Sequence, residues 1–205
     1  MELALVRHAH PDPSASPHQR HDPGLSSTGW QQAHAVADRL RHGPWDALYT
    51  SPQRRALDTA AVLADRLDLE PRTDEGLAEF DQGHPYLHLE DLLVEGNELM
   101  AAFRREDFSA YGTDAAAIRR KAVDTVEAII AAHPGRRVVV VTHGTVINAF
   151  VGGFLGSRRL VFHHPTYTGV TGVLAGRSGR REITCLNDSS HLRLPWRAPV
   201  DRSSR

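Results

Sequence analysis

Short, wholly apolar runs alternate along this chain with longer stretches in which apolar residues recur every three or four positions. The short runs predict buried β-strands at residues 2–6, 47–50 and 138–142. The longer stretches predict helices at residues 27–42, 113–133 and 145–155, and a further helix that starts near residue 51. Strands that alternate with helices in this way predict a layered α/β fold around a mostly parallel sheet.

The spacing of apolar residues also predicts which face each helix buries. Ser51 is a favourable N-cap for the second helix, and Pro52 suits its first turn, where a missing N–H costs nothing. The predicted buried stripes are Trp30, Ala33, Ala37 and Leu40 in the first helix, Ala56, Ala60, Leu63 and Leu67 in the second, and Ile118, Ala122, Val126 and Ile129 in the third.

The remaining segments are less regular. Residues 9–26 are rich in proline and glycine and predict a loop, while within residues 70–112 a helix at 89–105 is expected to form part of a lid or cap. Residues 168–175 and 182–186 predict a late hairpin, so at least one strand is antiparallel. We expect one domain over residues 1–193 and a disordered tail over 194–205.

Charge and cysteine content narrow the classes of function. The net charge is -1, which gives no reason to expect a nucleic acid or a membrane surface as partner. Lys121 is the single lysine, so a phosphate-binding cation in this chain is expected to be an arginine. One cysteine, Cys185, excludes an internal disulfide. With no signal peptide or membrane span visible, we expect a cytoplasmic protein.

Candidate chemistry gathers at two strand ends. The first strand runs into Arg7-His8 and the strand at 138–142 runs into His143-Gly144. Ligands of parallel sheets bind beyond the carboxyl ends of the strands, so these residues predict a single cationic pocket for a phosphate group. A neutral His8 is a nucleophile for phosphorus, and the absent side chain of Gly144 lets a ligand approach the backbone. For either histidine alone, a purely structural role is the alternative.

A third element strengthens this interpretation. Arg54 and Arg55 lie at the predicted start of a helix, where cations are unfavourable unless an anion is close by. Arg55 is the better candidate because Ala56 and Ala60 place the buried face beside it. The helix after His143 would likewise direct its N-terminal amides at the same anion.

Taken in order, Arg7-His8, Arg55-Ala56 with Thr59-Ala60, Leu77-Ala78-Glu79 and His143-Gly144 resemble the histidine phosphatase superfamily, in its phosphoglycerate-mutase-like branch. The resemblance implies a three-layer α/β/α sandwich and chemistry without metal or cofactor. It implies that His8 becomes a phosphohistidine, and that Glu79 protonates the leaving oxygen and then activates water. Arg7, Arg55 and His143 would complete the phosphate pocket.

Two departures from the family pattern qualify the resemblance. Ala9 replaces the usual glycine after Arg7-His8, a change of one methyl group that we expect to be tolerated. The loop that follows lacks the family's Glu-Thr and asparagine, and Ser14 is the substitute donor for substrate. Asp81 is the alternative to Glu79 as the acid. A bound phosphate dianion would raise the pKa of Glu79, and the arginines would oppose that shift.

The function predicted from these residues is a metal-independent phosphatase acting on a small phosphorylated metabolite. A phosphoglycerate mutase is the first alternative, and the altered loop that contains Ser14 argues against it. A non-catalytic domain that binds phosphorylated ligands is the second, and the complete set of site residues argues against it. The sequence leaves the substrate and the oligomeric state open, a homodimer included.

Overall fold

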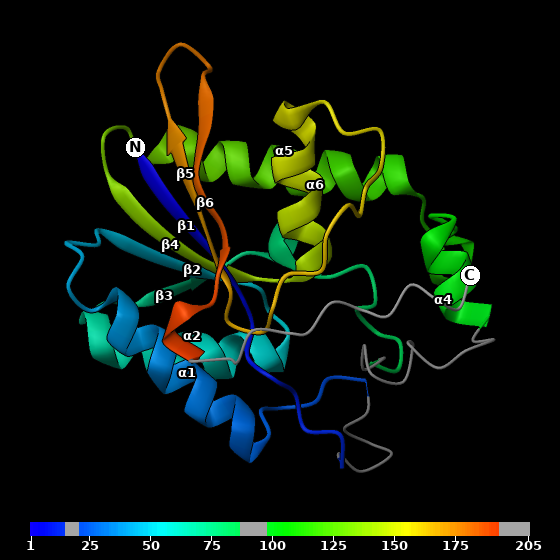
Figure 1. Ribbon diagram of the computed structural model, residues 1–205, viewed down its shortest axis with the longest axis horizontal. Helices are drawn as coiled ribbons and strands as arrows, with labels where there is room; N and C mark the ends of the chain where they lie inside the picture. Colours follow the sequence, from blue (N-terminus) through cyan, green and yellow to red (C-terminus); the bar gives the residue numbers. More distant parts are fainter. Residues whose placement is uncertain (15–20, 87–97, 193–205) are drawn as a thin grey trace, which may run out of the picture.

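The computed structural model describes residues 1–14, 21–86 and 98–192, and its centre is a six-stranded sheet (Figure 1). The spatial order is β3-β2-β4-β1-β5-β6. The first four run parallel, and β5 is antiparallel to both of its neighbours. The strands are β1 (Glu2–Arg7), β2 (Ala47–Thr50), β3 (Pro71–Thr73), β4 (Arg137–Thr142), β5 (Val170–Ala175) and β6 (Arg181–Asp188).

Helices cover both faces of this sheet. Alternate residues of β1 point to opposite faces, so that Leu3 and Leu5 join one apolar core while Ala4 and Val6 join another. Figure 1 shows α1 and α2 on one side and α5 and α6 on the other. The three-layer α/β/α sandwich is thereby confirmed. The helices are α1 (Ser27–Leu40), α2 (Arg54–Leu67), α4 (Glu98–Arg104), α5 (Ala115–Ala132) and α6 (Gly144–Leu155), with short 3-10 turns at η1 (Glu75–Leu77), η2 (Ser109–Tyr111) and η3 (Ser190–Leu192).

The predicted buried face of α1 is wrong at Trp30, which is 41% exposed. The helix turns Gly29 and Val36 inward instead. A side chain at Gly29 would collide with the His10 carbonyl, since a Cβ built there lies 2.1 Å from its oxygen. Because the loop that contains His10 packs closely on α1, Gly29 faces the loop and the Trp30 indole lies on the exposed side of the helix.

The predicted start of α2 is also wrong. Its N-cap is Gln53, in extended conformation, and the helix begins at Arg54, so Ser51 and Pro52 both precede it. The Ser51 hydroxyl lies 2.7 Å from Nε2 of His143 on the neighbouring strand end. The contact with His143 therefore engages the Ser51 side chain, which the local sequence had predicted to cap the helix.

Of the remaining elements, one was predicted correctly, one was not predicted, and two predicted segments lie wholly or partly outside the described residues. The stripe of α5 is confirmed, since Ile118, Ala122, Val126 and Ile129 are all buried. The strand β3 was not predicted, because its three residues are exposed and leave no apolar pattern. Of the helix expected at 89–105, the structure describes Glu98–Arg104 as α4. Residues 89–97 and the tail at 194–205 lie outside the described residues.

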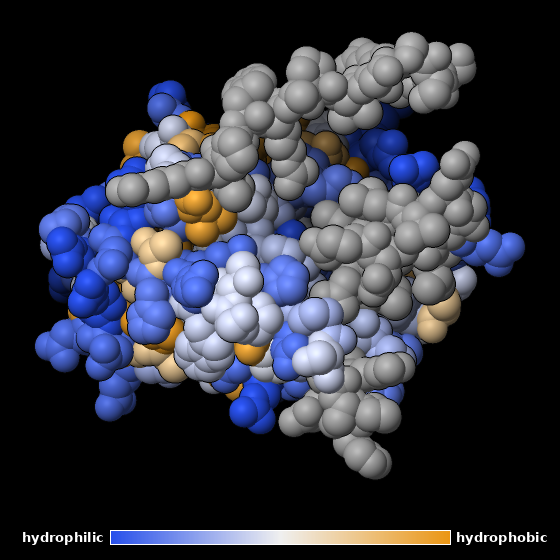
Figure 2. Space-filling view, turned by 60° about the horizontal axis from the view of Figure 1, so that its bottom comes forward, coloured by the Kyte–Doolittle hydropathy of each residue, from blue (hydrophilic) through white to orange (hydrophobic). Residues whose placement is uncertain are grey.

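The surface is largely polar on the face shown in Figure 2, where hydrophobic residues form small separate areas. Large apolar side chains with more than a third of their area exposed are few among the residues that the structure describes, and they lie on different elements: Trp30, Leu57, Leu155, Leu174 and Leu186. Within the same residues, no helix is long and apolar enough to span a bilayer.

The position of β1 at the centre of the sheet gives a stability prediction. Leu5 is fully buried, so Leu5→Ala should lower the free energy of unfolding by about 2–5 kcal/mol through lost burial and a cavity. Leu174→Ala on β5 is the matched control, because Leu174 is 42% exposed and should change that free energy by less than about 1 kcal/mol. Urea denaturation measures both, and equal losses would contradict this packing.

Candidate active site

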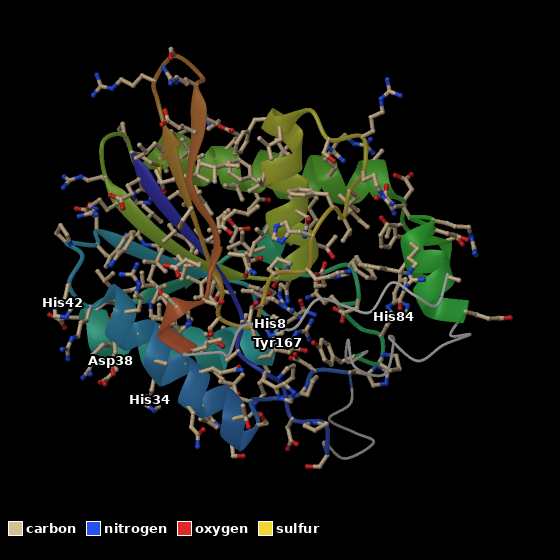
Figure 3. All side chains as sticks on the ribbon, viewed as in Figure 1. His8, His34, Asp38, His42, His84 and Tyr167 are labelled. Carbon is tan, nitrogen blue, oxygen red and sulfur yellow. The ribbon has the colours of Figure 1, made fainter. Side chains whose placement is uncertain are left out.

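The two histidines predicted from the strand ends lie side by side. β1 ends at Arg7 and β4 at Thr142, and these two residues pair across the sheet. The following residues, His8 and His143, therefore leave adjacent strands together, and their ring centroids are 5.0 Å apart. Both side chains are buried and line one cavity. Figure 3 shows His8 beside Tyr167 near the centre of the molecule.

A single hydrogen bond fixes the chemistry of His8. Its Nδ1 lies 2.8 Å from the carbonyl oxygen of Ala9, which can only accept, so Nδ1 carries the proton. Burial, and then the charges of Arg55 and Arg7, hold the pKa of His8 well below its usual value. The ring is consequently neutral at pH 7, and Nε2 keeps a lone pair. That is the form of imidazole that acts as a nucleophile.

His143 is held by Ser51. Its Nε2 lies 2.7 Å from the Ser51 hydroxyl oxygen, which already accepts the backbone N–H of Gln53. We assign the Ser51 proton to this contact, which leaves the proton of a neutral His143 on Nδ1. Burial and the Arg55 charge hold the pKa of His143 well below its usual value. The buried Nδ1 has no hydrogen-bond partner, so a neutral ring presents a donor.

Arg55 is the most deeply buried charge of the site, with no exposed surface. Its Nη2 donates to the two Asp81 carboxylate oxygens at 3.0 and 3.3 Å. Among the described residues, Nε and Nη1 have no hydrogen-bond partner, although the Asp22 carboxylate lies 4.0 Å from Nη1. Tyr86 covers the guanidinium, with its ring centre 4.4 Å from Cζ. Nε and Nη1 of Arg55 therefore keep N–H groups that can donate to an anion in the cavity, an arrangement that suits bidentate binding.

Arg7 faces the cavity in a similar way. Its Nη1 donates to the Pro165 carbonyl at 2.6 Å, and the Tyr167 ring lies 3.9 Å from its Cζ. Its Nε is buried without a hydrogen-bond partner. A Cβ built on Gly144 would lie 3.9 Å from this Nε. A side chain at Gly144 would therefore lie in contact with Arg7.

Glu79 lies between the 3-10 turn η1 and the start of α6. The backbone N–H of Thr145 donates to Oε2 at 3.1 Å, and the Phe80 N–H donates to Oε1 at 3.2 Å. Burial, and then the negative charge of Asp81, raise the pKa of Glu79 to about 7. The protein itself therefore raises this pKa before any phosphate contributes. A carboxyl that titrates near neutral pH can both give and take a proton.

Asp81 has a different setting, although it lines the same cavity. It accepts from Arg55 and, at 2.9 Å, from the Gln53 side-chain amide. Gln53 also accepts the Glu79 backbone N–H at 2.7 Å, so it ties the two acids together. Asp81 therefore holds Arg55 and Gln53 in place through its carboxylate.

The structure does not bring Ser14 to this site. Ser14 is exposed, and its hydroxyl donates to Asp12 at 2.7 Å within its own loop. It is absent from the described lining of the cavity, so it is not retained as a substrate-binding residue. Ala9, by contrast, is fully buried in the α1 and α2 core, and its N–H donates to Thr59 at 3.0 Å. The extra methyl group is therefore accommodated.

Sequence reasoning missed several residues that support the site. Gln53 binds both acids, and Ser51 contacts His143. The hydroxyls of Tyr86 and Tyr167 lie 3.2 Å apart, and their rings lie over the two arginines. The signal for Gln53 was its place just before Arg55. No local pattern marks the tyrosines, because Tyr86 contacts Arg55 and Tyr167 contacts Arg7, both distant in sequence.

The chain is similar to proteins of one known family. The model of the histidine phosphatase superfamily (branch 1) matches residues 3–189. A phosphoserine phosphatase 1 from Hydrogenobacter thermophilus is 29% identical over 171 residues, which cover 76% of this chain and 77% of the relative. A phosphoglycerate mutase-like protein 4 from Arabidopsis thaliana is 31% identical over 157 residues, covering 72% and 68%.

Solved structures agree with this match. The phosphoserine phosphatase from Entamoeba histolytica, in complex with 3-phosphoglyceric acid, superposes with a TM-score of 0.71 at 26% identity. The alignment covers 93% of this chain and 98% of that one. The likeness therefore extends over nearly the whole fold.

The coupling between the two acids can be measured directly. Asp81→Asn removes the negative charge that raises the pKa of Glu79 and leaves more of the Arg55 charge uncompensated, so that pKa should fall from about 7 toward its ordinary value. Carbon NMR of the Glu79 carboxyl, assigned with Glu79→Gln, follows the titration. Asp124→Asn on the exposed side of α5 is the control and should leave the pKa unchanged. A Glu79 pKa that stays near 7 in Asp81→Asn would contradict the coupling.

Proposed function

Because the chain belongs to the histidine phosphatase superfamily and is a phosphatase, we propose that it hydrolyses phosphomonoesters through a phosphohistidine on His8. Nε2 of His8 attacks phosphorus as the ester P–O bond breaks, and Glu79 gives its proton to the leaving oxygen. Water then attacks phosphorus while the Glu79 carboxylate takes a proton from it. The P–N bond breaks, inorganic phosphate leaves, and Glu79 is protonated again.

The observation that carries this proposal is the orientation of His8. The bond from Nδ1 to the Ala9 carbonyl leaves Nε2 as the atom with the lone pair, inside a cavity that also holds Glu79 and His143. Here the geometry supports attack on a phosphorus atom held in the same cavity.

The charges nearby support the same step. Arg7, Arg55 and His143 line one cavity, and each has a buried nitrogen without a hydrogen-bond partner among the described residues. A phosphate dianion bound there would supply the missing hydrogen bonds. The N-terminus of α6 begins at Gly144 and adds its partial positive charge. Positive groups that are fixed in advance stabilise the charge that develops on the transferring phosphoryl group.

A phosphoglycerate mutase is the second candidate, and the name of the Arabidopsis relative favours keeping it. A mutase would return the phosphoryl group from His8 to the sugar acid, whereas a phosphatase passes it to water. Release of inorganic phosphate measured against isomerisation of phosphoglycerate separates the two. We propose the phosphatase, since Ser14 and the other described residues of its loop supply no group to the cavity.

We further propose a small phosphorylated metabolite as substrate, with no metal or other cofactor needed for the chemistry. The Entamoeba relative is described in complex with 3-phosphoglyceric acid, which is a ligand of this kind. A cytoplasmic location and a homodimer stay predictions from the sequence. A non-catalytic binding domain is disfavoured because His8 and Glu79 are both placed to react.

The covalent intermediate is open to direct test. Brief mixing with a phosphorus-32-labelled ester, followed by denaturation, should leave label on the protein that survives alkali and is released by acid. His8→Ala should abolish the label and lower turnover by at least about a thousandfold. His34→Ala on the exposed side of α1 is the matched control and should retain both. An adduct that survives acid would refute the mechanism.

The role of Glu79 predicts a dependence on the leaving group. Glu79→Gln should slow alkyl phosphates by about 10²–10⁴-fold, because an alkoxide leaves poorly without a proton. It should slow p-nitrophenyl phosphate much less, since nitrophenolate leaves unaided. Steady-state kinetics with both esters measures the ratio. Equal losses in Glu79→Gln, with the dependence found instead in Asp81→Asn, would assign the acid to Asp81.

A further inference from the structure

We propose that the site selects phosphomonoesters whose leaving group is uncharged and aromatic, over those whose leaving group carries a carboxylate. This inference rests on the proposed phosphatase function and names the substrate class for it. It comes from the part of the cavity beyond the phosphate-binding groups, to which nothing in the catalytic scheme assigns a role.

That part of the cavity is bounded by rings that contact one another. The Phe80 centroid lies 4.9 Å from Phe108 and 4.8 Å from Tyr111, both in edge-on arrangements. Phe103 on α4 lies 6.2 Å from Phe80 and stacks on His164 at 6.4 Å. We call these five residues the aromatic wall. All five line the same cavity as His8 and Glu79.

The aromatic wall lies on the side of the phosphate that the leaving group occupies in the proposed mechanism. Glu79 gives its proton to the leaving oxygen, so the rest of the alcohol lies on the Glu79 side of the phosphate. Phe80 follows Glu79 in sequence, and its N–H donates to Oε1 of that carboxyl at 3.2 Å. The group attached to the leaving oxygen is thereby directed toward the rings of Phe80 and its neighbours.

Rings of this wall are available to a ligand. Phe80 and Phe103 are only partly buried, although they pack against the larger core. Aromatic rings in such positions favour offset or edge-on contact with another ring. Figure 1 shows α4, which carries Phe103, apart from the four helices that sandwich the sheet.

The charges at the cavity disfavour a carboxylate there. Among the lining residues that the structure describes, the arginines are Arg7 and Arg55, and both serve the phosphate. Burial lowers the pKa of His163 and His164, which keeps both imidazoles neutral at pH 7. Asp107 also lines the cavity, and its bonds to Ser109 lower its pKa, so it is negative.

Asn148, a polar residue of the cavity lining, is engaged by the protein itself. The Asn148 amide donates to the Gly144 and His163 carbonyls and accepts the Phe162 and His163 N–H groups. Its hydrogen-bonding capacity is therefore taken up by the protein. Arg104 on α4 is exposed and does not line the described cavity, although its charge contributes to the lowered pKa of His164.

The test uses four esters of primary alcohols, so that intrinsic leaving ability stays comparable: benzyl phosphate, ethyl phosphate, phosphoserine and 3-phosphoglycerate. Phosphate release by the intact chain gives kcat/KM for each. Burial of the added ring should make benzyl phosphate about 10- to 100-fold better than ethyl phosphate. Phosphoserine and 3-phosphoglycerate should be no better than ethyl phosphate.

Variants assign the preference to the wall. Phe103→Ala should lower kcat/KM for benzyl phosphate about tenfold more than for ethyl phosphate. Phe154→Ala is the matched control, because Phe154 on α6 packs on Phe150 outside the described cavity lining, and it should keep the ratio of the wild type. Phe103→Arg supplies the missing cation and should shift the preference toward phosphoserine.

Each outcome of this test has a distinct meaning. A preference for phosphoserine or 3-phosphoglycerate in the wild type overturns the inference while leaving the phosphatase function intact. Loss of that preference in Arg104→Ala would identify the cation responsible. An unchanged benzyl-to-ethyl ratio in Phe103→Ala also overturns it. If no ester releases phosphate, or if His8→Ala releases it equally fast, the proposed function itself fails.

Discussion

The buried guanidinium of Arg55 is the constraint around which the rest of the site is arranged. A charge without solvent contact is costly unless it is paired. Asp81 bonds to Nη2 of Arg55, and the Asp22 carboxylate lies 4.0 Å from Nη1. Burial, and then the Arg55 charge, lower the pKa of His8 and His143, which keeps both rings neutral. The same charge that would attract a phosphate therefore preserves the nucleophile.

Sheet topology explains how distant residues meet here. β1 and β4 are adjacent and parallel although their sequences lie more than 100 residues apart, so their last residues deliver His8 and His143 to one edge. The start of α2 brings Arg55 and Gln53, and the start of α6 brings the amide that binds Glu79. The cavity is thus built from the ends of elements whose interiors are ordinary apolar core. That arrangement lets the core provide stability without compromising the chemistry.

The sequence predicted those features that depend on local pattern. Apolar runs marked β1 and β4, and the polar residues that ended them were those that reach the cavity. Prediction failed where a distant contact decided the outcome. The His10 carbonyl turned Trp30 outward, and His143 took the Ser51 hydroxyl. The aromatic wall has no sequence signature either, because its rings come from four separate segments with no shared period.

The central claim is that the unpaired N–H groups of Arg7, Arg55 and His143 form one anion site facing Nε2 of His8. A crystal structure of the protein with orthovanadate tests it most directly. The account predicts one vanadate with oxygens about 2.7–3.2 Å from those nitrogens and with vanadium facing His8 Nε2. Vanadate bound away from Arg55, or facing Nδ1 of His8, would contradict it.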